Sequence, residues 1–309
     1  MDKSPFNNLT GIPVFFLQFG KSPKFINKIL QQAQYTNGKE NVYFLTDTDT
    51  HLYKEFNCID ISKYAGACEE FGKVYQHYSV NLHFYEKACI DRWFIINALV
   101  KEFKIPWFFY ADCDLLILED LTPVHHKLTE QNYAGGMMFY SNIENDITSA
   151  HSSFWSAELL NEFCLFTYNI YADATKFEAL LADSQTTTPQ GGIHISDMTL
   201  IEVFRKQTSL AILSLLSLQS QDICFDMNIN MPDNGLGYNF IMNGFLKIKK
   251  LRKRKDGVFG IVAGKGEMKF YTLHFQGYFS KFLIPLYMSA SSLNIFKRVY
   301  VIQKYLRQR

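Results

Sequence analysis

The sequence predicts an α/β protein with a mostly parallel central sheet flanked by helices, followed by a C-terminal amphipathic helical appendage. Short apolar runs alternate with stretches of helical periodicity through the first third of the chain. This alternation is typical of parallel strands joined by crossover helices. Neither an internal repeat nor a long linker interrupts the 309 residues, so we expect one domain before the appendage.

The first third is expected to run strand, helix, strand, helix, strand. A buried strand is predicted over residues 12–19, a helix over 25–37 and a second strand over 42–45. A long helix over 83–103 then leads directly into an aromatic strand at 107–111. An Asp-x-Asp pair follows each of the two later strands, at the sheet edge where α/β proteins bind ligands.

The remaining chain continues the mixed pattern. We expect strands over 133–139, 223–226 and 270–275, because these short apolar runs lie between turn-forming residues. Helices are expected over 154–171 and 197–204, where apolar residues recur at helical spacing. The whole therefore remains a single α/β unit.

Composition narrows the classes of function. Hydrophobic residues make up 48% of the chain and charged residues 20%, which is ordinary for a globular protein. A net charge of +1 gives no electrostatic case for nucleic acid as a partner. Six cysteines without a Cys-x-x-Cys pair indicate reduced thiols, and we find no signal peptide and no apolar run long enough to span a membrane. We therefore expect a cytoplasmic protein.

The pair Asp112 and Asp114 is the first candidate for chemistry. Two carboxylates at the end of one strand repel each other unless a cation lies between them, and a divalent metal supplies that cation. The alternative is that these aspartates cap the next element. Asp47 and Asp49 form a rival pair, but the later pair is flanked by stronger strands, so we favour it for metal and expect Asp47 to contact a nucleotide.

The chain resembles glycosyltransferases of the GT-A fold, a Rossmann-like α/β architecture. The resemblance is carried by residues 108–114, by the helix over 86–93 and by His274-Phe275-Gln276-Gly277, and it spans about residues 12–281. The branch it is most similar to includes glycogenin and bacterial lipopolysaccharide galactosyltransferases. The resemblance implies a divalent cation, Mn²⁺ first and Mg²⁺ second, held by Asp112, Asp114 and His274. From the residues alone, His274 is by default a core or surface histidine.

The resemblance also implies a nucleoside-diphosphate sugar as donor, with a UDP-sugar as the first expectation. Residues 12–120 would form the part that binds it, and residues 121–281 the acceptor side. The branch often has His-x-x-Gly-x-x-Lys, whereas here the lysine is one place late. Arg92 is expected to contact the diphosphate or an aspartate of the metal pair, and the alternative is a surface salt bridge with Asp91 or Glu86. The residues expected to contact the nucleotide sugar are Phe16, Gln18, Asp47, Arg92, Gly277 and Lys281.

Asp197 is the candidate for the catalytic carboxylate, because it follows a glycine-containing loop in the region where related enzymes place sugar contacts. It would be a general base in an inverting enzyme, or would orient the donor sugar in a retaining one, which the resemblance slightly favours. The alternative is a first-turn charge on a helix that Ser196 caps. Trp155 and His194 are the candidates for donor or acceptor sugar contacts, although Trp155 could belong to the core.

Basic residues gather in two places late in the chain. Residues 247–255 are a run of lysine and arginine, and residues 282–309 read as a basic amphipathic helix. Together they suggest peripheral docking on an anionic membrane face, where lipid-linked glycan acceptors of polysaccharide or lipopolysaccharide synthesis are found. The alternatives are a solvated hairpin for the run and a helix packed back on the domain.

The leading hypothesis is thus a metal-dependent glycosyltransferase that moves a hexosyl group to a glycan or lipid-linked saccharide. A phosphatase of the haloacid dehalogenase type also places Asp-x-Asp after an apolar strand, but usually near the start of the chain. A nucleotidyltransferase would want a richer phosphate loop than residues 20–24 offer. A non-catalytic carbohydrate-binding protein of the same fold is the third alternative.

Overall fold

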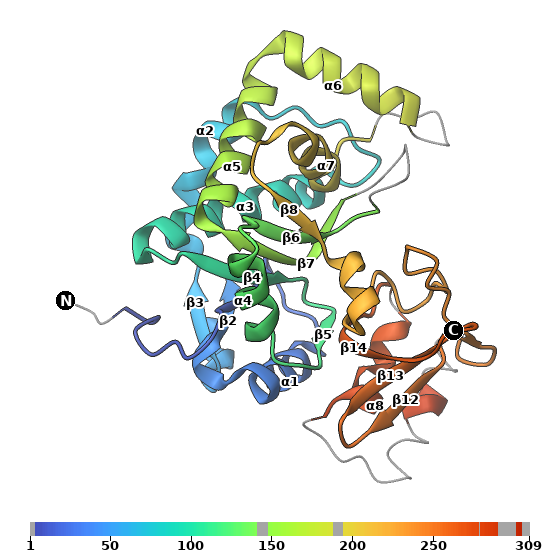
Figure 1. The fold of residues 1–309 in the computed structure, drawn as a ribbon. Coiled ribbons are helices and arrows are strands. Elements are labelled where there is room, and N and C mark those ends of the chain that lie inside the picture. The colour runs from blue at the N-terminus through green and yellow to red at the C-terminus, as the bar shows by residue number, and fades with distance from the viewer. Residues whose placement is uncertain (1–3, 141–147, 188–193, 278, 290–300, 305–309) are drawn as a thin grey trace.

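The computed structural model describes residues 4–140, 148–187, 194–277, 279–289 and 301–304 (Figure 1). A seven-stranded sheet forms its centre, in the strand order β3-β2-β1-β4-β7-β6-β8. Strands β3, β2, β1 and β4 are parallel, as are β6 and β8, whereas β7 runs antiparallel to both its neighbours. The predicted α/β class with a mostly parallel sheet is therefore confirmed. The strands are β1 (Val14–Gln18), β2 (Val42–Thr46), β3 (Asn57–Asp60), β4 (Trp107–Ala111), β6 (Gly135–Met138), β7 (Ser149–Ser156) and β8 (Ile212–Ser214).

Helices cover both faces of this sheet, because successive side chains of a strand point to opposite faces. On β1, Phe16 packs into one apolar cluster and Phe15 into the other. Helices α1 and α4 contribute to the first cluster, and α3, α5 and α7 to the second. The helices are α1 (Ile26–Asn37), α2 (Glu69–Val74), α3 (His83–Phe103), α4 (Thr122–Glu130), α5 (Ala157–Ala172), α6 (Ala174–Thr187), α7 (Asp197–Gln207) and α8 (Ile284–Tyr287).

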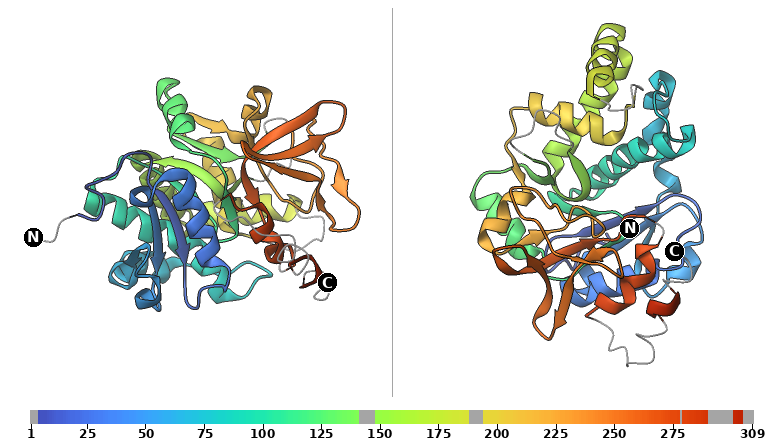
Figure 2. Two further views of the ribbon diagram at one scale, coloured as in Figure 1. Left: turned by 90° about the horizontal axis from the view of Figure 1, so that it is seen from below. Right: turned by 90° about the vertical axis from the view of Figure 1, so that its right-hand side faces the viewer.

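A second, antiparallel sheet lies beside the first, as the orange strands of Figure 2 show. Its order is β12-β13-β14-β5, with β9 parallel to β14, and a separate two-stranded ribbon joins β10 and β11. The register places His274 opposite Leu115, directly after the Asp-x-Asp pair. The strands are β5 (Leu115–Ile117), β9 (Cys224–Phe225), β10 (Met242–Asn243), β11 (Ile248–Lys249), β12 (Leu251–Arg254), β13 (Gly257–Val262) and β14 (Gly266–His274).

Two elements differ from the sequence prediction. The helix expected over 154–171 begins only at Ala157, because residues 149–156 form β7 between β4 and β6. Ser156 then caps the helix by accepting a hydrogen bond from the backbone N–H of Leu159. The last strand begins at Gly266 rather than at residue 270. Ser196 caps α7 as predicted.

The predicted C-terminal appendage lies only partly within the described residues. Residues 280–283 form a 3₁₀ turn that α8 continues, and the buried side chains of Leu283 and Ile284 pack into the first apolar cluster. Residues 290–300 and 305–309 lie outside the description. Among the described helices, none is long and apolar enough to cross a lipid bilayer.

Candidate metal and donor site

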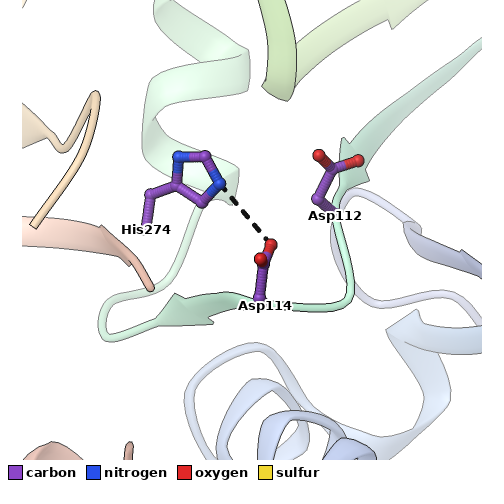
Figure 3. A group of neighbouring side chains, drawn as sticks. All are labelled: Asp112, Asp114 and His274. Carbon is purple, nitrogen blue, oxygen red and sulfur yellow. Dashed lines mark ion pairs between the residues drawn. The ribbon is translucent and has the colours of Figure 1, made fainter. Parts of the chain in front are cut away.

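Three potential metal ligands meet where the two sheets join. Asp112 and Asp114 lie in the short connection from β4 to β5, and His274 ends β14. One ligand atom from each lies within 4.8 Å of the others, and Figure 3 shows the three side chains converging. Two backbone bonds hold this connection: Leu115 N–H donates to the Asp112 carbonyl at 2.9 Å, and Phe275 N–H to the Asp114 carbonyl at 3.0 Å. Two carboxylates and one imidazole suit a divalent cation such as Mn²⁺.

The His274 ring is oriented by its surroundings. Its Nδ1 lies 2.8 Å from the carbonyl oxygen of Met227, which can only accept, so Nδ1 carries the proton. Its Nε2 then faces Asp114 Oδ1 at 3.5 Å. The ring also stacks on that of His151, with centroids 4.1 Å apart. A fixed Nδ1–H that leaves Nε2 toward the site is the arrangement that metal-binding histidines use.

A buried ion pair lies directly behind His274. Lys249 donates to Asp226 Oδ1, and both side chains have no exposed surface. The second carboxylate oxygen of Asp226 accepts the His274 backbone N–H at 3.0 Å. Lys249 also donates to Asn234 Oδ1 at 2.9 Å. Because these groups are fully bonded, they fix the end of β14 relative to β11.

Positive groups gather around Asp114. Lys281 Nζ lies 2.9 Å from Asp114 Oδ2, so the late position of this lysine does not prevent it from reaching the metal pair. Burial raises the pKa of the Asp114 carboxyl, but the neighbouring His274 ring and the charge of Lys281 outweigh it and hold the pKa well below its usual range. Burial lowers the pKa of His274, but the neighbouring Asp114 carboxylate outweighs burial, so the pKa of His274 is raised above its usual value. Asp114 is therefore a carboxylate at neutral pH.

Arg92 connects the metal pair to the candidate catalytic carboxylate. Its guanidinium donates to Asp112 Oδ1 at 3.0 Å and, through its other terminal nitrogen, to Asp197 Oδ2. Tyr110 donates to the same Asp112 oxygen at 2.8 Å, so Oδ2 of Asp112 keeps its lone pairs for a ligand. Burial lowers the pKa of Arg92, but the neighbouring Asp197 carboxylate outweighs it and the pKa is raised. The Trp93 indole N–H also donates to Asp197, at 3.3 Å.

A cavity of about 1000 Å³ opens in front of these groups. It is lined by the end of β1, the start of α1, one side of α3, the Asp-x-Asp connection and the turn that contains Lys281. Phe84 and Tyr85 are among its lining residues and are largely exposed. Such a volume is at the upper end for a small-molecule site. Five of the predicted site residues line it: Gln18, Arg92, Asp112, Asp114 and Lys281.

The other predicted residues do not line the cavity, including His274 and Asp197, which lie behind it in contact with Asp114 and Arg92. Phe16 and Trp155 have no exposed surface, so neither ring can stack on a ligand in this structure, and Trp155 donates its indole N–H to Ser153. Asp47 accepts the backbone N–H of Gly20 at 2.7 Å and so shapes the loop after β1.

His194 and Gly277 also lie outside the cavity lining, in the loops that precede Asp197 and follow His274. His194 Nδ1 is 2.9 Å from Ser79 Oγ, which in turn donates to the buried Glu86. Gly277 takes a φ of 86° that favours glycine, in the turn between His274 and Lys281. Residues 191–193 of the loop before Asp197 lie outside the described residues.

Sequence reasoning missed three contributors to the site. Tyr110 and the pair Asp226–Lys249 bond to the candidate metal ligands, and Lys28 lines the cavity. Tyr110 could have been found, because it precedes Asp112 by two residues and so shares its face of the strand. Nothing in a basic run marks Lys249 as buried.

No protein-family model matches the chain, and no curated protein matches it. Among solved structures, mouse xyloside xylosyltransferase 1 in its apo form shows 12% identity and a TM-score of 0.43, with 65% of this chain and 83% of that chain covered. Core-mannan synthase A of Aspergillus fumigatus in its Mn/GDP form shows 8% identity and a TM-score of 0.39, with 67% and 72% covered. A glycosyltransferase involved in the glycosylation of the PBCV-1 major capsid shows 12% identity and a TM-score of 0.36, with 66% and 81% covered. At these TM-scores the likenesses support no assignment of function, which must come from the site itself.

Proposed function

We propose that this protein is a divalent-metal-dependent glycosyltransferase, which moves a sugar from a nucleoside-diphosphate sugar to a glycan or lipid-linked saccharide. The observation that carries the proposal is the convergence of Asp112, Asp114 and His274, with Lys281 on Asp114, where Asp112, Asp114 and Lys281 also line a large cavity. Hard oxygen ligands and a cationic side chain at one point fit a metal-bound diphosphate. Mn²⁺ is favoured over Mg²⁺ because imidazole is not a preferred ligand of Mg²⁺.

Each residue then has a role at the departing diphosphate. When bound, a divalent cation stabilises the negative charge that develops on this leaving group. Lys281 adds a mobile positive charge beside Asp114 and can turn from the carboxylate to a phosphate oxygen. We propose that Gln18, which lines the cavity at the end of β1, contacts the nucleoside, and a UDP-sugar is the first donor to test.

Asp197 is proposed to act through Arg92 on the donor. A carboxylate that already accepts from a guanidinium and an indole N–H is a poor proton acceptor, so its bonding argues against a general base. Holding Arg92 toward Asp112 and the cavity is compatible with a retaining transfer, in which no protein base is required to activate the acceptor. We therefore propose retention, with Asp197 as a positioning residue.

The competing phosphatase function is not favoured by the bonding at the aspartate pair. In such an enzyme one aspartate attacks phosphorus and needs an accessible oxygen aimed at the substrate. Here Asp112 Oδ1 is held by Arg92 and Tyr110, and the two oxygens of Asp114 face His274 and Lys281, so only Oδ2 of Asp112 is left, and the proposed metal ion would take it. In a protein that only binds carbohydrate, gathering these charged groups at one place would cost free energy and serve no purpose.

Docking on an anionic membrane remains a proposal. In the predicted basic run, Lys249 is buried in its ion pair, and Arg252 and Arg254 both pair with Glu267 on β14. The run therefore presents fewer free cations than its composition suggests. A flotation assay with vesicles containing anionic lipid tests whether the remaining basic residues suffice.

The proposed activity is tested by a screen for slow hydrolysis of sugar nucleotides, which needs no acceptor. We expect Mn²⁺-dependent release of UDP from at least one UDP-sugar, and loss of this release in Asp114→Asn. The circular dichroism of the variant checks that it folds. Release that continues unchanged in the chelated protein or in Asp114→Asn would contradict the proposal.

A further inference from the structure

The cavity carries a second group of positive side chains away from the metal ligands. Lys21 and Lys24 lie in the loop after β1, Lys28 lies in the first turn of α1, and Lys304 reaches the cavity from the last described segment. Six cationic side chains line the cavity in all, against two carboxylates. Those two carboxylates already face Arg92 and Lys281. No ion pair joins any of the four lysines to an acidic residue in the described part of the chain.

Helix stability does not explain lysines at this place. The N-terminal end of a helix carries partial positive charge, so cations there are unfavourable and acidic residues are favoured. Helix α1 has no acidic residue in its first turn and no side-chain cap, yet Lys24 precedes it and Lys28 lies within that turn. A bound anion would reverse the sign of this interaction.

Lys28 and Lys304 also act on each other. Burial lowers the pKa of Lys28, and the charge of Lys304 lowers it further, so the two ammonium groups are close enough to repel. Lys304 is held near the cavity by Phe282, whose ring centroid lies 5.3 Å from its Nζ. Two like charges held over one cavity favour an anion between them.

We propose that Lys24, Lys28 and Lys304 form a second anion subsite, which binds a phosphate-type oxyanion without a metal ion. A cavity of about 1000 Å³ is large enough to hold this group beside a metal-bound diphosphate. The subsite therefore serves a phosphate ester elsewhere on a substrate, on the donor or on the acceptor. The binding of phosphate at this subsite does not depend on the proposed glycosyl transfer, whereas its role on a donor or acceptor rests on that proposal.

Inorganic phosphate, titrated by calorimetry in the presence of EDTA, tests the subsite. We expect saturable binding to the wild type and binding at least as tight to Asp112→Asn, which lacks one metal ligand and one negative charge of the cavity. Lys28→Gln and Lys304→Gln should each weaken the binding by about tenfold, the effect of losing one charge-assisted hydrogen bond. Lys255→Gln, an exposed lysine in the turn after β12, is the matched control and should bind as the wild type does.

Three results would overturn the subsite: no saturable phosphate binding, binding that EDTA or Asp112→Asn abolishes, or binding that both lysine variants retain. Melting temperatures without phosphate separate binding from folding, because removing one of two repelling charges should not lower stability. The proposed enzyme can fail independently, since its Mn²⁺ requirement is measured with Asp114→Asn. Phosphate-bearing donors and acceptors, compared with their unphosphorylated forms, then identify which substrate uses the subsite.

Discussion

Single residues determine the electrostatics of the metal site, and Lys281 is the most informative among them. Its ammonium is 2.9 Å from Asp114, where it neutralises a carboxylate that a metal ion would also need. The side chain therefore competes with the metal in the absence of a diphosphate and assists it in the presence of one. The effect of Lys281 on metal affinity can therefore be measured separately from its effect on nucleotide affinity.

Lys281→Met should leave Mn²⁺ affinity intact or higher, because it removes the competitor at Asp114. The affinity for UDP in saturating Mn²⁺ should fall by about tenfold or more, since a charge-assisted bond to phosphate is lost. Calorimetry of both ligands measures the two effects, with Lys281→Arg as the control that keeps the charge. Equal losses of Mn²⁺ and UDP affinity would show that Lys281 acts on the fold instead.

The burial of His125 makes the free energy of unfolding depend on pH. Burial, followed by the charge of His126, lowers the pKa of His125 to about 4, against about 6.5 in an unfolded chain. As pH falls from about 6.5 toward 4, the unfolded state takes up a proton that the folded state does not, so stability is lost in this window. Above it, the residue has no effect.

His125→Gln should therefore flatten the loss of stability between pH 7.5 and pH 5. Urea denaturation at the two pH values measures the difference for the wild type and the variant. Carboxyl groups with a lowered pKa titrate below pH 5, so they do not change the stability difference between pH 7.5 and pH 5. An identical pH slope in the two proteins would rule out this role of His125.

Among the elements, β14 and β11 are joined by the buried pair of Lys249 and Asp226. Removing one partner leaves an uncompensated buried charge, which typically costs about 3–5 kcal/mol. Lys249→Met should destabilise the protein by this order and also disturb His274, whose backbone N–H is bonded to Asp226. Urea denaturation measures the loss.

The double variant Lys249→Met with Asp226→Asn should recover part of that stability, because the buried charge is removed. Lys255→Met is the control at an exposed lysine of the neighbouring hairpin. If Lys249→Met and Lys255→Met cost the same, the ion pair contributes nothing specific to the junction of β11 and β14.

Strand β6 requires glycine for close packing against β7. A Cβ added to Gly135 would lie 2.8 Å from the Phe154 carbonyl oxygen and against the Leu159 side chain. Gly135→Ala should thus lower the free energy of unfolding by about 1–3 kcal/mol. Gly244→Ala, where a Cβ meets nothing within 4 Å, is the matched control and should be nearly neutral. Similar stability of the two variants by thermal denaturation would contradict the close approach.

At the scale of the whole molecule, the sequence predicted the sheet and marked Asp112 and Asp114 as candidate metal ligands because both follow from simple patterns. His274 was a candidate through the family resemblance. Continuous apolar runs that end in carboxylates mark strands and their ligand-binding ends. Strand β7 was not predicted because its serines make a buried segment look polar in the sequence. Residues 154–156 of this strand were assigned to the following helix. The burial of Phe16 and Trp155 depends on which elements cover the two faces of the sheet. The sequence of a single strand does not reveal this.

The same limit applies to the second sheet. Lys249 belongs to a run that reads as solvated, and only the long-range contact with Asp226 makes it a core residue. In the folded molecule, the Asp-x-Asp connection leaves the first sheet at β4 and enters the second at β5, where β14 brings His274. The candidate metal site thus lies at the junction of the two sheets.

Titration of Mn²⁺ by electron paramagnetic resonance in the presence of UDP tests this site most directly, because the free ion gives the signal. The account predicts one saturable Mn²⁺ site per chain, weakened at least about tenfold in Asp114→Asn. Asp256→Asn, an exposed aspartate in the hairpin turn before β13, should bind as the wild type does. A signal that the protein and UDP leave unchanged, or equal binding by Asp114→Asn and the wild type, would contradict the account.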